Sequence, residues 1–144
     1  MKLRQVRQAL TAQIAWSLDF GPFEDHEATT CQASDLISDI LSLRGPGSLL
    51  LTGLTNTQVI RTAEILDFVA ICFVRGKRPQ EETVRLAEEK GIPLLVTPLS
   101  MYESSGRLYA LGLPASAGKE GLDACRTEKR PESKSLSMSS ESVT

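Results

Sequence analysis

The most constraining feature of this sequence is a repeat of short apolar runs from Gln32 to Gly112, each followed by a turn signal and an amphipathic segment. The runs include Leu49–Leu51, Val69–Val74 and Leu94–Val96, and glycine, proline or charged residues bound each one. Such runs are typical of strands that are buried on both faces of a parallel sheet, joined by right-handed crossover helices. The pattern predicts the α/β class: a single three-layer domain with a small, mainly parallel β-sheet flanked by helices.

Amphipathic segments between the apolar runs predict the helices that cover this sheet. Residues 56–66 and 79–90 carry apolar side chains at helical spacing, the first group directly behind Asn56. A further helix is expected after the strand Cys31–Ala33, with Ser34 or Asp35 as its cap. Its expected buried stripe comprises Leu36, Ile37, Ile40 and Leu41.

The same signals define the two ends of the globular region. A short first helix is indicated by Leu3, Val6 and Leu10, and residues 13–18 are expected to form a strand. A last helix is expected from Leu99 to Leu111, where Gly112 and Pro114 provide stop signals, with an inward face of Tyr102, Leu108 and Tyr109. Beyond it, serine and charged residues dominate and apolar residues come singly, which cannot offset chain entropy. We therefore expect a domain over residues 1–113 and a disordered tail over residues 114–144.

Composition and charge exclude several classes of function. Sixteen basic and eighteen acidic residues give a net charge of -2, which provides no electrostatic footprint for nucleic acid, and aromatic residues at 5% offer few stacking platforms. No apolar stretch approaches the roughly 20 residues of a membrane span, and no apolar region follows the charged start as in a signal peptide. The sequence thus predicts a cytoplasmic protein that binds neither nucleic acid nor membranes.

Cysteine and histidine usage argues against catalysis and against a cofactor. Cys31, Cys72 and Cys125 lie far apart and form no paired motif, so a zinc or iron–sulfur site is not expected. Cys31 and Cys72 lie in apolar strand contexts, which indicates buried and unreactive thiols. The single histidine, His26, lies among acidic residues and is interpreted as a solvated loop residue. We therefore expect a non-catalytic protein without a cofactor.

Polar and basic residues gather where the predicted strands end. The carboxyl ends of parallel strands meet at one edge of a sheet, where helix N-termini favour anions. This edge is expected to bind a phosphate-bearing metabolite or nucleotide through Ser34, Asp35, Ser38, Thr52, Gly53, Asn56, Arg75, Gly76, Lys77, Arg78 and Thr97. Helix capping is the competing interpretation of Ser34, Asp35 and Asn56, and a solvated loop is the competing interpretation of residues 75–78.

Four short segments occur in an order and spacing that resemble a known family. They are residues 34–39 (SDLISD), residues 51–56 with the LTG triplet and Asn56, residues 75–79 (RGKRP) and residues 91–97 (GIPLLVT), all within about residues 1–113. Together they resemble the DRTGG domain family, and more closely the stand-alone DRTGG proteins that anaerobic bacteria encode beside genes for iron-only hydrogenase. The resemblance implies a fold like the N-terminal domain of HPr kinase/phosphorylase.

The resemblance also implies what the domain does. In relatives it is a regulatory or ligand-sensing and dimerising module, so a homodimer is expected here. The alternative that the resemblance leaves open is an accessory protein that docks onto an iron-only hydrogenase or a related electron-transfer complex and binds no small molecule. The segment that names the family departs from its pattern, because residues 25–30 read DHEATT, without the arginine or the paired glycines. Thr29 and Thr30 do not supply the backbone freedom of those glycines, so this loop is not among the predicted site residues.

Overall fold

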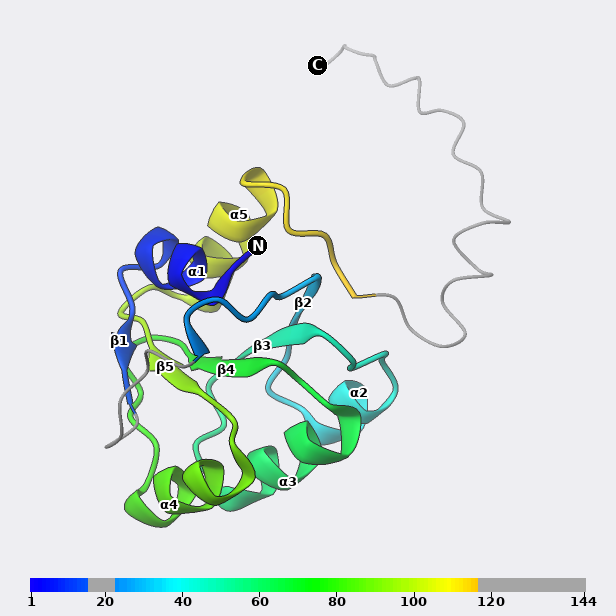
Figure 1. The fold of residues 1–144 in the computed structure, drawn as a ribbon, viewed down its shortest axis with the longest axis vertical. Coiled ribbons are helices and arrows are strands. Elements are labelled where there is room, and N and C mark those ends of the chain that lie inside the picture. The colour runs from blue at the N-terminus through cyan, green and yellow to red at the C-terminus, as the bar shows by residue number, and fades with distance from the viewer. Residues whose placement is uncertain (16–22, 117–144) are drawn as a thin grey trace, which may run out of the picture.

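A five-stranded sheet forms the middle layer of the computed structural model, which describes residues 1–15 and 23–116 (Figure 1). Its strands are β1 (Gln13–Ile14), β2 (Thr30–Ala33), β3 (Ser48–Thr52), β4 (Ala70–Phe73) and β5 (Leu94–Val96), in the spatial order β1-β5-β4-β3-β2. Strands β2 to β5 are parallel, whereas β1 pairs with β5 in the antiparallel direction. The predicted α/β class is confirmed, with a sheet that is mixed because of β1.

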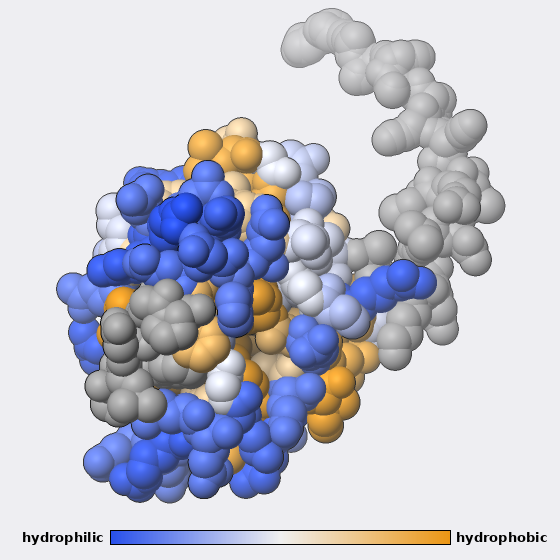
Figure 2. Space-filling model, viewed as in Figure 1, coloured by the Kyte–Doolittle hydropathy of each residue, from blue (hydrophilic) through white to orange (hydrophobic). Residues whose placement is uncertain are grey.

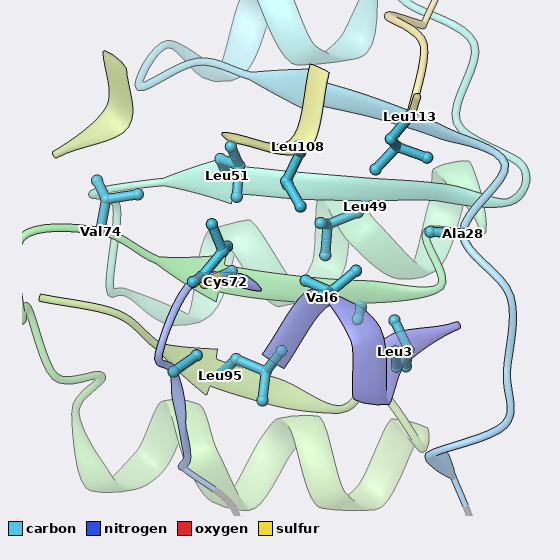
Figure 3. Close-up of a cluster of buried hydrophobic side chains, with 13 residues drawn as sticks. Leu3, Val6, Ala28, Leu49, Leu51, Cys72, Val74, Leu95, Leu108 and Leu113 are labelled. Atoms are coloured by element: carbon cyan, nitrogen blue, oxygen red, sulfur yellow. The ribbon is translucent and has the colours of Figure 1, made fainter. Parts of the chain in front are cut away.

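Helices cover both faces of the sheet and bury one apolar cluster on each. One face is covered by α1 (Leu3–Ala9) and α5 (Met101–Ala110), and the other by α2 (Ile37–Leu41), α3 (Thr57–Leu66) and α4 (Glu81–Lys90) (Figure 1). Figure 3 shows the first cluster, in which Leu3 and Val6 of α1 and Leu108 of α5 meet Leu49, Leu51 and Cys72 of the sheet. Because both faces are covered, every residue of β3, β4 and β5 is buried, as the continuous apolar runs predict.

Two of the three ten-residue helices, α3 and α5, begin at a side-chain cap close to where the sequence predicts their start, whereas Gln80 at the start of α4 makes no such hydrogen bond. Asn56 accepts a hydrogen bond from the Val59 amide at 3.4 Å at the start of α3, and Ser100 accepts one from the Glu103 amide at 3.1 Å at the start of α5. At the other end, α4 stops at Gly91, whose φ of 72° lies in the left-handed region that glycine adopts freely.

Two expectations about buried helical faces are wrong. In α2, Ile40 is fully buried, but Leu36 and Leu41 are 56% and 43% exposed, because a helix of five residues is too short to place a whole stripe against the sheet. In α5, Leu108 is buried, but Tyr102 and Tyr109 are 90% and 72% exposed. The buried face of α5 is a narrow stripe that Ser104 and Leu108 form, and the tyrosine rings lie outside it.

The described chain ends beside the edge strand. The Cys31 amide donates to the Pro114 carbonyl and the Ser116 amide donates to the Cys31 carbonyl, both at 2.9 Å, so residues 114–116 run parallel to β2. These three residues therefore pack on the domain, although the sequence analysis assigned them to the tail. The rest of the predicted tail, and residues 16–18 of the predicted first strand, lie outside the described residues. No helix in the described ranges has the length and apolar character that a membrane crossing requires.

Candidate ligand-binding site

The centre of the candidate site is a hydrogen-bonded contact between two loops at the carboxyl ends of β2 and β3. One carboxylate oxygen of Asp35, Oδ1, accepts hydrogen bonds from the Gly53 amide at 2.6 Å and from the Thr52 hydroxyl at 3.2 Å. The prediction that Ser34 or Asp35 caps α2 is therefore wrong, because the Asp35 carboxylate bonds to the next loop. Its neighbour Ser34 accepts a hydrogen bond from the Leu36 amide at 3.1 Å, whereas the cap position itself is Leu36 and has no side-chain cap.

Lys77 brings a third loop to the same place. A Cβ atom at Gly53 would lie 3.4 Å from Asp35 Oδ1 and 3.6 Å from Cδ of Lys77. The aliphatic stem of Lys77 and the Asp35 carboxylate thus both lie close to the Gly53 backbone. Loops that follow β2, β3 and β4 converge on Gly53, as the edge rule for parallel sheets predicts.

The loop after β4 is a tight turn that two left-handed residues form. Arg75 and Gly76 have φ angles of 60° and 67°, and the Lys77 amide donates to the Val74 carbonyl at 3.1 Å. The turn is held to the loop after β5 because the Gly76 amide donates to the Thr97 carbonyl at 2.7 Å. Gly76 therefore supplies the turn, while Arg75 accepts a conformation that is unfavourable for a residue with a Cβ atom.

The cationic side chains near this turn differ in whether they bond to another described residue. Arg75 and Lys77 are exposed and form no ion pair with any residue that the structure describes. The Arg78 guanidinium, in contrast, donates to the Gln13 side-chain oxygen of β1 at 2.9 Å. Lys77 lies close to Gly53, and its ammonium group forms no ion pair with the described residues, so its charge is available to a ligand.

Helix dipoles at this edge are not equivalent. The first turn of α3 holds no acidic residue, so its free amides and positive dipole end favour an anion. The first turn of α4 carries Glu81 and Glu82, which oppose an anion there. The Thr83 hydroxyl of α4 donates to the carbonyl of Thr55, in the loop before α3, at 2.8 Å and so holds the start of α4 against that loop.

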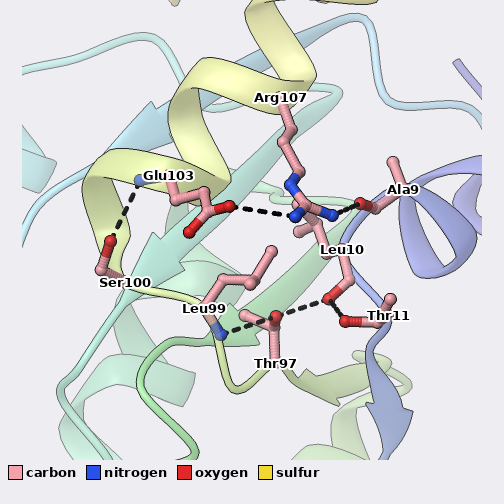
Figure 4. A network of polar contacts seen from close by, with 8 residues as sticks. All are labelled: Ala9, Leu10, Thr11, Thr97, Leu99, Ser100, Glu103 and Arg107. Atoms are coloured by element: carbon pink, nitrogen blue, oxygen red, sulfur yellow. Dashed lines mark hydrogen bonds and ion pairs between the residues drawn. The ribbon is translucent and has the colours of Figure 1, made fainter.

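Other predicted site residues are engaged elsewhere or lie apart from Gly53. Thr97 is fully buried, and its hydroxyl donates to the Leu10 carbonyl at 2.6 Å and accepts from the Leu99 amide at 3.2 Å (Figure 4). This hydroxyl fastens the end of α1 to β5. Asn56 acts as the cap of α3, and Ser38 is exposed on α2 without a hydrogen bond to the Gly53 cluster.

The two described cysteines are not placed as nucleophiles. Burial raises the pKa of both thiols to about 12, and for Cys72 the charge of a Cys31 thiolate is a second, smaller cause. Both thiols are therefore protonated near neutral pH. The described residues include no group of three or more histidine, cysteine, aspartate and glutamate side chains that could hold a metal ion.

Sequence reasoning missed a second surface feature, an apolar hollow between α5 and the edge strand β2. Its volume is about 390 Å³, and its lining includes Cys31, Ala33, Tyr102, Gly106 and Tyr109. Cys31 is for this reason only half-buried. The signal that could have indicated the hollow is the pair of tyrosines seven residues apart, which the sequence analysis placed inward.

Residues 25–29, in the segment that departs from the family pattern, lie before β2 and hence at the opposite, amino end of the strands. There Asp25 forms an ion pair with Arg4, and the Thr29 hydroxyl donates to the Gly47 carbonyl at 3.3 Å. Both contacts hold the loop against α1 and the start of β3. The loop is therefore separated from the Gly53 cluster by the length of the strands.

Comparison with solved structures identifies a protein of similar fold. The CBS and DRTGG domains of the regulatory region of Clostridium perfringens pyrophosphatase, solved with the activator diadenosine tetraphosphate, superpose with a TM-score of 0.62 and 15% sequence identity. The match covers 83% of this chain and 51% of that one, so this chain spans about half the length of its structural neighbour. The chain has a DRTGG-like fold. No protein-family model matches the sequence, and no curated protein matches it either.

Proposed function

We propose that this protein is a non-catalytic regulatory module that senses a phosphate-bearing metabolite or nucleotide at the carboxyl ends of its parallel strands. The observation that carries the proposal is the convergence of three loops on Gly53, where Asp35 and the stem of Lys77 both lie close to the glycine and Lys77 has no ion-pair partner among the described residues. An anionic ligand group would gain the Lys77 charge and the amides at the start of α3. The Asp35 carboxylate has a second oxygen, Oδ2, which can accept a hydrogen bond from a ligand hydroxyl.

Two further considerations support the proposal. The structural neighbour is part of a regulatory region and was solved with a nucleotide activator. The described thiols are protonated near neutral pH, and His26 is exposed at the opposite end of the strands, which leaves the Gly53 cluster without a thiolate or an imidazole base. In this proposal the protein acts in the cytoplasm, uses no cofactor, and shares its fold type with the N-terminal domain of HPr kinase/phosphorylase.

Thermal unfolding of the full chain against a panel of nucleotides and phosphorylated metabolites tests the proposal. A ligand at 100 times its dissociation constant stabilises the folded state by about 2.7 kcal/mol, which raises Tm measurably. The test variant is Lys77→Met, because methionine keeps a flexible stem close to Gly53 and removes the charge. We expect a selective shift in the wild type that Lys77→Met reduces or abolishes.

Lys90→Met is the matched control, because Lys90 ends α4 at the opposite edge of the sheet, where it pairs with Glu64 at 3.3 Å. This control removes the same charge and should keep the full ligand-induced shift. A shift that survives Lys77→Met would place the ligand elsewhere. A panel without any shift would contradict the sensing function.

A panel without any shift would favour the second candidate, an accessory protein that docks onto an iron-only hydrogenase or a related electron-transfer complex. The observation behind this candidate is the pair of exposed leucines that bound α2, Leu36 and Leu41. Figure 2 shows an apolar area in the part of the surface where Figure 1 places α2. Exposed apolar side chains that adjoin each other are typical of protein contacts. The test is a variant with both Leu36→Ser and Leu41→Ser. If this variant still co-purified with the redox subunits of its host, the two leucines would not form the docking surface.

A further inference from the structure

One face of α5 carries a symmetric set of side chains. Tyr102, Ser105, Gly106 and Tyr109 share this face, because residues three, four and seven positions apart lie on the same side of a helix. The tyrosines are 90% and 72% exposed, and among the described residues no atom outside the adjoining helix backbone and the two chain neighbours lies within 4 Å of the place that a Cβ atom of Gly106 would occupy. The face is therefore low in the middle and bounded by two large exposed rings.

Hollows flank this face on both sides. The hollow toward β2 is about 390 Å³ in volume, and a second one, toward the side that carries Glu103 and Arg107, is about 520 Å³. Tyr102 and Gly106 line both. The exposed part of α5 is thus a ridge between two grooves, which is the shape that packs against another helix.

The order of residues along the ridge indicates which helix can pack against it. Residues 102–109 read YESSGRLY, in which a tyrosine stands at each end and two small residues at the centre. A two-fold interface uses the same patch on both subunits and must therefore be self-complementary. If two α5 helices lie antiparallel about a point between Ser105 and Gly106, each Tyr102 faces Tyr109 of the second copy and each Ser105 faces Gly106 of the second copy.

This arrangement matches large residues with large ones and small residues with small ones. The two aromatic pairs gain stacking or edge contacts, and the small residues let the helix backbones approach closely at the crossing point. Pairing through the sheet edge is less suitable for a second copy, because residues 114–116 already occupy the hydrogen-bonding groups of Cys31.

From these observations we infer that the α5 ridge, formed by Tyr102, Ser105, Gly106 and Tyr109, is the interface of a homodimer in which the two α5 helices cross antiparallel at Ser105 and Gly106. The interface uses none of the residues of the Gly53 cluster, so it does not depend on the proposed ligand. It gives the homodimer that the family resemblance implies a specific surface and register.

The first test is the mass of the full chain in solution, by sedimentation equilibrium over a range of concentrations. We expect the wild type to reach twice 15.7 kDa and Gly106→Lys to remain at 15.7 kDa. The lysine has room in a single subunit and replaces a glycine inside a helix, so Tm of the monomer should not fall. The control is Ile65→Lys, which places the same charge at a 73% exposed apolar position of α3 and should remain dimeric.

The second test is the register of the two helices. In a Cys125→Ser background, a Tyr102→Cys chain is mixed with a Tyr109→Cys chain under mild oxidation. The antiparallel arrangement predicts that the mixed disulfide forms at least tenfold faster than either symmetric one. A wild type that stays monomeric at all concentrations, a Gly106→Lys chain that stays dimeric, or a preference for symmetric disulfides would each overturn the inference.

Discussion

At the scale of single residues, the chain uses several polar groups to connect loops that its sequence pattern suggested as ligand contacts. Thr97 is the clearest case, because its hydroxyl both donates to Leu10 and accepts from Leu99 in a fully buried position. Spacing alone identifies Thr97 as the residue after a strand, but it does not reveal that the end of α1 lies against it. Long-range contacts of this kind follow from the folded chain and not from local sequence.

Thr97→Val is expected to destabilise the protein by about 1 to 3 kcal/mol, because the Leu99 amide loses its acceptor and the Leu10 carbonyl loses a donor in a buried place. Urea-induced unfolding measures the change. Thr97→Ser keeps the hydroxyl and should recover most of the loss. If both variants unfold at the wild-type midpoint, the hydroxyl contributes no stability.

Thiol reactivity provides a second test at the residue scale. In a Cys125→Ser variant, Cys31 and Cys72 have a pKa of about 12 instead of 9, so at pH 8 the folded chain holds about 1,000-fold less thiolate than the unfolded chain. Labelling with a disulfide reagent should be correspondingly slow and should accelerate about tenfold for each unit of pH. Labelling in urea gives the reference rate, and equal rates in both states would contradict the assigned burial.

The same pKa increase has a consequence for stability. The protonated thiols are favoured in the folded state, so their contribution is complete below pH 9, the ordinary pKa of the thiols. It is lost as the pH rises from about 9 towards about 12, because the unfolded chain ionises first. The free energy of unfolding should therefore fall over this range, and less so in a Cys72→Ala variant than in the wild type.

At the scale of elements, close packing between a loop and a helix restricts one glycine and leaves another free. A Cβ atom at Gly45, in the loop before β3, would lie 2.2 Å from the carbonyl oxygen of Leu66 at the end of α3. Gly45→Ala is therefore expected to cost about 1 to 3 kcal/mol, because the loop must move away from the helix. Gly53→Ala, whose Cβ atom would make contacts of 3.4 Å and longer, should change the free energy of unfolding much less.

Much of the element order could be predicted from the sequence, and the failures have a common cause. The strands β3 to β5 and the helices α3 to α5 carry strong signals, because continuous apolar runs and side-chain caps such as Asn56 act locally. The side of α5 that faces the core was wrong because Tyr102 and Tyr109 satisfy the same spacing as a buried stripe. The buried face of α5 follows from its packing on β3 and α1, where Leu108 joins the cluster that holds Leu49 and Leu51.

The candidate site shows the same division. The edge rule for parallel sheets correctly brought Asp35, Gly53 and Lys77 together, since it depends only on strand direction. It could not predict that Arg78 reaches Gln13, because that contact requires the antiparallel addition of β1. The edge rule also could not predict how α2 begins, because Asp35 bonds to the next loop instead of capping the helix.

At the scale of the whole molecule, the edge strand β2 depends on the last described segment of the chain. Removal of residues 114–116 would take away two backbone hydrogen bonds to Cys31 and the hydrogen bond from the Ser116 hydroxyl to the Arg44 carbonyl at 2.5 Å. A chain that ends at Leu113 should therefore be less stable than one that ends at Ser116, by about 1 to 3 kcal/mol. Unfolding of the two truncated chains in urea, each compared with the full chain, measures this difference.

If the two truncated chains were equally stable, residues 114–116 would contribute nothing to stability and the domain would end at Leu113, the boundary that the sequence predicts. A large loss on truncation at Ser116 itself would mean that later residues also stabilise the fold.

The position of that segment also matters while the protein is being made. A ribosome releases the chain from its N-terminus onward, so the sheet can assemble as soon as β5 has emerged, while residues 114–116 are still inside the exit tunnel. During this interval the outer backbone groups of β2 are open to other nascent chains. The pairing of residues 114–116 with β2 is thus a late step in the folding of this domain. A translational pause after β5 would prolong the time in which neighbouring chains can associate with the open edge of β2.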